Sequence, residues 1–133
     1  MAHQLSDKNT QIRKAFNEHL VEFFEDLANA MPSQLDIKKG VEATKLLKKT
    51  KPKHIIENWK YYYELHKERI DNEGIQFYMT YDCKQDISKP ELSYIEEMIE
   101  RIKQSFHILS GSDKKKTYEY IKNLNKLVDM YVM

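Results

Sequence analysis

The sequence contains few of the residues from which common small-molecule sites are built. Glycine occurs three times, at Gly40, Gly74 and Gly111, which are too far apart to form a phosphate-binding loop or a dinucleotide fingerprint. The single cysteine, Cys83, excludes an internal disulfide and a cysteine-rich zinc site. Nucleotide binding by either loop, and zinc binding by a cysteine cluster, are therefore excluded.

The histidines lack the spacing of metal ligands. No two of them are four residues apart, and none follows a carboxylate by three positions, so the helical zinc motif and the Glu-x-x-His motif of di-iron bundles are both missing. The five positions are His3, His19, His54, His66 and His107. We therefore expect no metal, no cofactor and no enzyme. A spatially assembled site would draw on residues such as His66, Asp82 and Cys83.

Long apolar runs are also missing. No segment approaches the roughly 20 apolar residues that span a bilayer, and the first ten residues lack the apolar stretch of a secretory signal. We therefore expect no membrane insertion. The single cysteine fits a reducing compartment, so an intracellular location is expected.

What the chain does contain is enough to fold. Its 133 residues are 41% hydrophobic and 32% charged, which is typical of one domain with an apolar core and a hydrated surface. No repeat, low-complexity tract or long linker divides it. We expect a single helical domain over residues 1–133.

Apolar residues recur at spacings of three and four along most of the chain, which is the period of an amphipathic helix. The first helix is expected to start near Ser6 or Asp7 and to end at Met31-Pro32, because a residue before proline avoids helical geometry. A second, short helix is expected from a Ser33 cap to about Lys49. Its apolar residues are Leu35, Val41, Leu46 and Leu47.

Three more helices follow from the same pattern. Pro52 suits the first position of a third helix, and Gly74 suits its end. Ser88 and Glu91 resemble a capping box before a fourth helix, and Ser110 is expected to cap the last. The stripes of the first, third, fourth and last helices are Ile12, Phe16, Leu20, Phe23, Leu27 and Ala30; Ile55, Ile56, Trp59, Tyr62, Tyr63, His66 and Ile70; Leu92, Ile95, Ile99, Ile102, Phe106 and Leu109; and Tyr120, Ile121, Leu124, Leu127, Val128 and Tyr131.

The stretch 75–87 is ambiguous. Ile75, Phe77, Met79 and Tyr81 alternate as in a strand, but no second strand is available to pair with it. A short helix or an extended packed segment is favoured, and an edge strand in an oligomer is the alternative. The predicted fold is all-α, a compact bundle of four to five short helices with an irregular or short-helical segment at about 75–87.

Charge is unevenly distributed, although the net charge is +1. Residues 36–60 contain eight lysines against three acidic residues, which gives this segment +5. Such a segment is either a solvated face that pairs with the acidic first helix, or a surface for phosphate or an acidic partner. The candidate contact residues are Lys38, Lys39, Lys45, Lys48, Lys49, Lys51, Lys53, Lys60 and Tyr61.

Nucleic acid is one possible partner of this segment. It contains no arginine, the side chain that most often reads guanine, so lysine contacts would give salt-sensitive binding without sequence preference. Tyr61 beside Lys60 could stack on a single strand. The string 48–51, Lys-Lys-Thr-Lys, also resembles a nuclear import signal.

Several segments together resemble a family of small proteins of nucleocytoplasmic large DNA viruses, the giant viruses. They are 16–20 with Glu22-Phe23, Met31-Pro32, 36–38, 48–53 leading to Ile56 and Trp59, Phe77-Tyr78, and 120–127 with Tyr131. Lys51 departs from the family pattern, which has asparagine before the proline. The resemblance implies a viral protein that acts in an infected cell or is packaged in a particle, and it carries over no catalytic residue.

We therefore expect a non-enzymatic viral protein that binds other macromolecules, first of all protein, or a structural component of the virion. Nine tyrosines exceed what one small core needs, and tyrosine is enriched at interfaces. The alternative is a nucleic-acid-binding accessory factor that uses residues 36–60. Oligomerisation, residence in the host cytoplasm or a viral factory, and nuclear import all stay open.

Overall fold

The computed structural model describes residues 2–80 and 93–133, which form six α-helices and no strand. The helices are α1 (Ala2–Ala30), α2 (Leu35–Thr50), α3 (His54–Glu73), α4 (Ile75–Thr80), α5 (Ser93–Ile108) and α6 (Gly111–Met130). The predicted all-α fold is confirmed. The helix α1 has 29 residues, so it is not one of the short helices that the sequence led us to expect.

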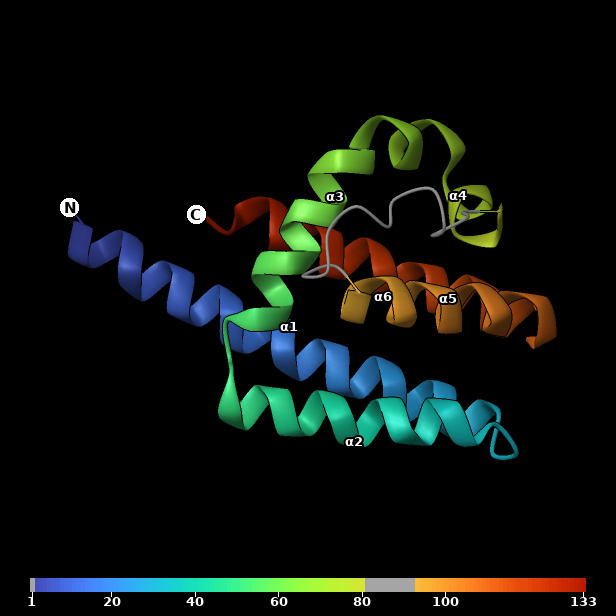
Figure 1. Ribbon diagram of the computed structural model, residues 1–133. Helices are drawn as coiled ribbons and strands as arrows, with labels where there is room; N and C mark the ends of the chain where they lie inside the picture. The colour runs from blue at the N-terminus through green and yellow to red at the C-terminus, as the bar shows by residue number, and fades with distance from the viewer. Residues whose placement is uncertain (1, 81–92) are drawn as a thin grey trace.

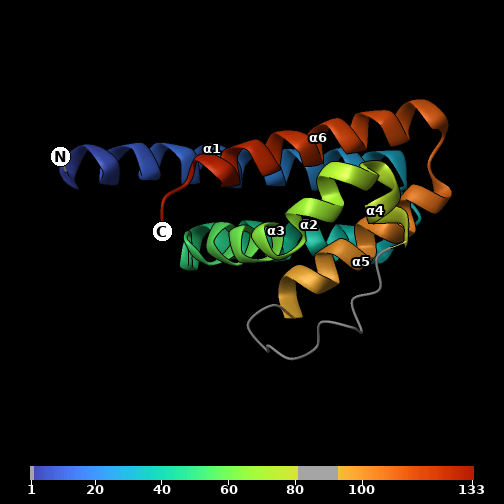
Figure 2. The same ribbon diagram turned by 90° about the horizontal axis from the view of Figure 1, so that it is seen from above.

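The long helix α1 organises the fold. It packs against α2 along one side and against α6 along another (Figures 1 and 2). From the end of α2 the chain turns into α3, which rises away from α2 and packs on α6 (Figure 1). The short helix α4 connects α3 to α5 by contacts with both. The helices therefore share one core, and the outer sides of α2 and α3 remain at the surface.

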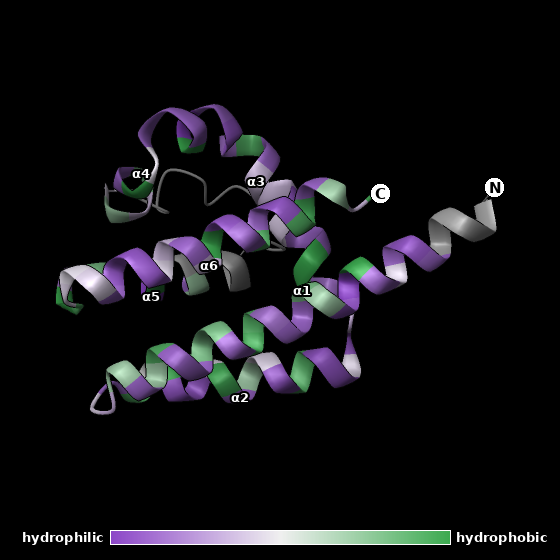
Figure 3. Ribbon diagram, turned by 180° about the vertical axis from the view of Figure 1, so that it is seen from behind, coloured by the Kyte–Doolittle hydropathy of each residue, from purple (hydrophilic) through white to green (hydrophobic). Residues whose placement is uncertain are grey.

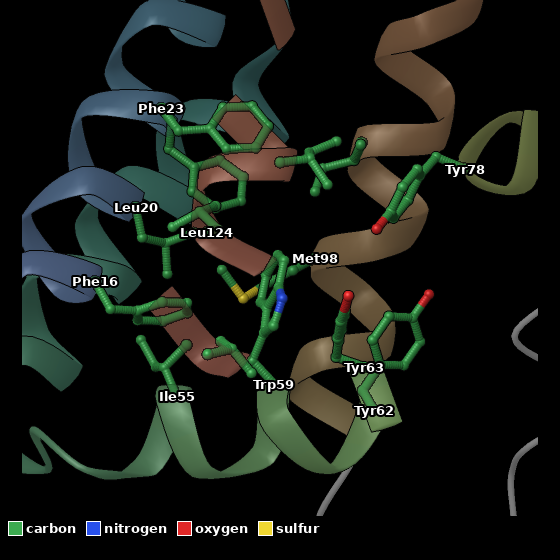
Figure 4. Close-up of a cluster of buried hydrophobic side chains, with 14 of the residues drawn as sticks. Phe16, Leu20, Phe23, Ile55, Trp59, Tyr62, Tyr63, Tyr78, Met98 and Leu124 are labelled. Carbon is green, nitrogen blue, oxygen red and sulfur yellow. The ribbon is translucent and has the colours of Figure 1, made fainter. Parts of the chain in front are cut away.

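Trp59 lies at the centre of that core. Its indole is fully buried, and Figure 4 shows it among side chains from α1, α5 and α6, with Phe16, Met98 and Leu124 around it. The rings of Phe16 and Trp59 meet edge to face with their centroids 5.8 Å apart, a favourable aromatic geometry. The core thus joins the first, third, fifth and last helices.

The predicted stripes supply most of the core, and hydrophobic residues recur between hydrophilic ones along α1 and α2 in Figure 3. Ala30 is exposed, whereas Phe24, which the first stripe omits, is fully buried. His66, Tyr120 and Leu127 are half-buried. The remaining stripe residues of α1, α3 and α6 are buried, as are Ile102, Phe106 and Leu109.

Two helix ends follow the sequence closely. Gly74 ends α3 with a positive φ of 58°, a conformation that glycine adopts without a Cβ penalty. Ser110 caps α6, and its side-chain oxygen accepts a hydrogen bond from the backbone N–H of Asp113. At these two ends the local signals in the sequence agree with the observed boundaries.

Three other predicted helix starts are wrong. The first helix is already formed at Ala2, before Ser6 and Asp7. Gln34 rather than Ser33 precedes α2, and its side chain makes no capping bond. Pro52 lies in the turn, because α3 begins at His54. The local cap signals of the sequence therefore do not mark these three starts.

Some predictions concern residues outside the described part of the chain. Within 75–87, the predicted short helix is confirmed at 75–80, which form α4. Residues 81–87, including Tyr81, lie outside the described part of the chain. The same is true of the capping box at Ser88 and Glu91, and of Leu92. Helix α5 contains Ile95 and Ile99, but their side chains are not among those described.

Candidate functional site

The nine predicted contact residues lie on three consecutive parts of the chain. Five of the lysines are on α2, two are in the turn that follows it, and Lys60 and Tyr61 are on α3. All of them are exposed except Lys60, which is half-buried. The exposed lysines of α2 and the turn are Lys38, Lys39, Lys45, Lys48, Lys49, Lys51 and Lys53.

Lys60 does not belong to this surface, which corrects the prediction. Its side chain is 12% exposed, and its Nζ lies 3.2 Å from the backbone oxygen of Val128 and 3.2 Å from Oε1 of Glu64. Val128 is in the last turn of α6, where the negative end of the helix dipole favours a positive charge. Lys60 therefore holds α3 to the end of α6.

The expected pairing between the lysine-rich segment and the acidic side of α1 occurs at one position. Lys45 Nζ lies 3.3 Å from Oε1 of Glu25, and both side chains are about half exposed. Such surface pairs contribute roughly 0–1 kcal/mol, so this pair holds Lys45 only weakly. Within the described residues, no ion pair involves Lys38, Lys39, Lys48, Lys49, Lys51 or Lys53.

Two leucines that the sequence assigned to the apolar pattern of α2 point outward instead. Leu35 is 66% exposed and Leu46 is 61% exposed, whereas Ile37, Val41 and Thr44 form the buried side. Leu35 and Leu46 are eleven residues apart, about three turns, so they share one side of the helix. Lys39, Glu42 and Lys49 share that side. We call these five residues (Leu35, Lys39, Glu42, Leu46 and Lys49) the basic face of α2.

A buried asparagine fixes the turn at the end of this face. Asn17 of α1 donates from Nδ2 to the backbone oxygen of Pro52 over 2.9 Å. The adjacent Lys51 and Lys53 are thereby held at the surface beside the N-terminus of α3. Sequence reasoning missed this role, although the signal was present as an asparagine one turn before Leu20 on the buried side of the first helix.

A hollow lies between α1 and α6. This cavity of about 150 Å³ has Phe23 and Leu27 in its wall and Asp26 and Tyr120 among its polar groups. Tyr120 Oη donates to Oδ2 of Asp26 at 2.5 Å, and Lys116 Nζ lies 3.4 Å from the same oxygen. The Asp26 carboxylate is therefore already paired within the protein.

Of the three residues named for a spatially assembled enzyme site, His66 is the one that lies in the described part of the chain. His66 is half-buried and packs on the rings of Tyr62 and Phe77, with centroid distances of 5.0 and 5.4 Å. Asp82 and Cys83 lie outside the described residues. Over 2–80 and 93–133, no group of three or more potential ligand side chains could hold a metal ion.

Tyr120 gives a testable pH dependence. The hydrogen bond to Asp26, together with burial, raises its pKa from 10.0 to about 12. As pH rises, the unfolded chain releases the Tyr120 proton before the folded protein does. The contribution of protonated Tyr120 to the free energy of unfolding is therefore complete below pH 10 and is lost as pH rises to about 12. Over this pH range, the free energy of unfolding of Tyr120→Phe should fall less than that of the wild type. Urea unfolding at each pH measures both. An equal loss in both proteins would contradict this.

Comparison with known proteins gives no relative from which a role could be transferred. No family model matches the chain, and neither the curated proteins nor the solved structures provide a match. Of the helices in the described residues, none has the length and apolar character needed to cross a bilayer. The basic face of α2 and the turn beside it are therefore interpreted from their own chemistry.

Proposed function

We propose that this chain is a non-enzymatic protein that works by binding another protein through the basic face of α2. One observation carries the proposal: two widely exposed leucines share a helix side with lysines that form no ion pair within the described residues. The resemblance described above would place this interaction in a virus-infected cell or in a virus particle. Oligomers of the chain itself fit the same proposal.

The leucines favour a protein partner over nucleic acid. Phosphate contacts need only positive charge, so Leu35 and Leu46 would stay exposed to water on a nucleic-acid backbone. A protein interface buries such side chains at its centre and surrounds them with charged residues. Charge complementarity then speeds association with an acidic surface.

Paired substitutions test this proposal. Leu35→Gln with Leu46→Gln removes the apolar part and keeps every charge, while Lys39→Gln with Lys49→Gln does the reverse. Each pair should reduce capture of the partner from infected-cell extract or disrupted particles about tenfold, because interface residues of this kind contribute about 1–2 kcal/mol. Lys115→Gln with Lys126→Gln, exposed on α6, is the matched control and should leave capture unchanged.

Sequence-indifferent nucleic-acid binding is the second candidate. The observation in its favour is the group of four exposed lysines at the turn, Lys48, Lys49, Lys51 and Lys53, beside the N-terminus of α3. It predicts salt-sensitive retention of DNA or RNA that is lost when all four become glutamine and is unchanged in the leucine variant. That pattern would contradict the protein-binding proposal.

A further inference from the structure

The outer side of α3 carries an exposed apolar residue in an acidic setting. Leu65 is 55% exposed and Tyr61, one turn earlier, is 39% exposed. Glu64 and Glu68 are exposed beside them. Glu64 forms a surface pair with Lys60, whereas Glu68 forms no ion pair within the described residues. We call Tyr61, Glu64, Leu65 and Glu68 the acidic face of α3.

Two charged positions beside Leu65 on the acidic face have counterparts of opposite charge beside Leu46 on α2. Around Leu46, lysines stand one residue before and three residues after, at Lys45 and Lys49. Around Leu65, glutamates stand at the same two offsets, at Glu64 and Glu68. At 100° per residue both offsets place the charges on the same flank of the leucine. Glu42, one turn before Leu46, lies on the same flank, so this flank of α2 carries two lysines and one glutamate, and the corresponding flank of α3 carries two glutamates.

We propose that the partner of the basic face of α2 is the acidic face of α3 in a second copy of this chain. When two helices face each other in antiparallel directions, identical flanks lie opposite one another. Leu46 would then pack beside Leu65, and Lys45 and Lys49 would meet Glu68 and Glu64. Lys45 would exchange its surface pair with Glu25 for this contact, and Glu64 would exchange its pair with Lys60. Opposite charges across such a helix pair select partner and orientation, and the leucines supply apolar burial.

The geometry of the fold makes this contact intermolecular. Helices α2 and α3 diverge from the turn at 51–53 (Figure 1), so the two faces of one molecule cannot close on each other. Each copy therefore offers one face to one neighbour and the other face to the next. Such head-to-tail contacts between unlike surfaces form rings or open chains. The inference rests on the proposed function, since it names the partner of the same basic face.

Two complementary variants test the contact. Leu46→Gln with Lys49→Gln disables the basic face, and Leu65→Gln with Glu68→Gln disables the acidic face; neutral replacements keep the two altered faces from pairing with each other. All four positions are exposed, so the fold should persist by circular dichroism. In sedimentation velocity at low salt, the average mass of the wild type should rise with concentration above 16.0 kDa, and salt should weaken the rise.

A mixture of the two variants provides the decisive result. Each variant alone should stay monomeric, with at least about a tenfold higher dissociation constant, whereas mixing them should give a capped dimer through the one intact face of each. Lys115→Glu with Lys126→Glu, on α6, should associate like the wild type. A monomeric wild type, a variant that still associates, or a mixture without dimers would overturn the inference. Leucine-dependent capture of a different protein would leave the proposed function standing in each of these cases.

Discussion

Asn125→Ala should lower the free energy of unfolding by about 2–4 kcal/mol. Asn125 is buried in α6 and connects two other helices. Its Oδ1 accepts from Nε1 of Trp59 over 3.0 Å, and its Nδ2 donates to Oη of Tyr78 over 3.0 Å. Alanine would leave the indole N–H of α3 and the phenol oxygen of α4 without these bonds inside the core. Unmet buried polar groups cost about 1–3 kcal/mol each.

Urea unfolding followed by tryptophan fluorescence measures this loss, because Trp59 is the single tryptophan. Asn123→Ala is the matched control, since Asn123 is exposed on the same helix and has the same side chain. Its unfolding free energy should change by less than about 0.5 kcal/mol. Equal effects of the two substitutions would show that the buried hydrogen bonds contribute no stability.

Phe16→Ala should lower the free energy of unfolding still more, by about 3–5 kcal/mol. The ring of Phe16 is fully buried and meets Trp59 edge to face, so alanine would open a cavity at the centre of the core. That loss is a large part of the 5–15 kcal/mol typical of whole domains. Thermal and urea unfolding should show the same order of stabilities.

Two further variants separate the cavity from other causes. Phe16→Leu keeps most of the buried volume and should cost roughly 1.5 kcal/mol. Lys14→Ala, exposed on the same helix, should be close to neutral. If Phe16→Ala were as stable as Lys14→Ala, the packing of α1 on α3 described above would be incorrect.

The fold was largely predictable because its helices are strongly amphipathic. Ile102, Phe106 and Leu109 follow one another at steps of four and three residues. Such a pattern predicts a helix that buries the side carrying them, as observed. Glycine at Gly74 and serine at Ser110 act within a few residues of themselves, so their roles could be inferred without knowing the neighbours. The all-α fold is the direct result.

The candidate site was less predictable, because its properties depend on which helices meet. Leu35 and Leu46 fit an apolar pattern, but α2 buries the side that carries Ile37 and Val41. The sequence assigned Lys60 to a basic surface. In the fold its Nζ lies beside a backbone carbonyl oxygen of α6 instead. These outcomes arise from tertiary contacts, which periodicity does not specify.

Buried polar residues show the same limit. Asn17 and Asn125 lie among apolar neighbours on their helices, which is a visible anomaly in the sequence. Their partners are 35 and 66 residues away at Pro52 and Trp59. The sequence could mark these asparagines as unusual, but only the packed helices reveal what they bind.

Site-specific photo-crosslinking tests the docking surface on α2 most directly. A photoreactive phenylalanine derivative would replace Leu46 in one protein and Ile108 in another. Both residues are exposed, but Ile108 lies on α5 beside Gln34 and Ile37 at the start of α2, whereas Leu46 lies in the second half of that helix. In the cells that produce the protein, the derivative at position 46 should yield a discrete protein adduct that high salt reduces, and the derivative at 108 should not. Adducts at 108 with none at 46 would contradict the assignment of α2 as the docking surface.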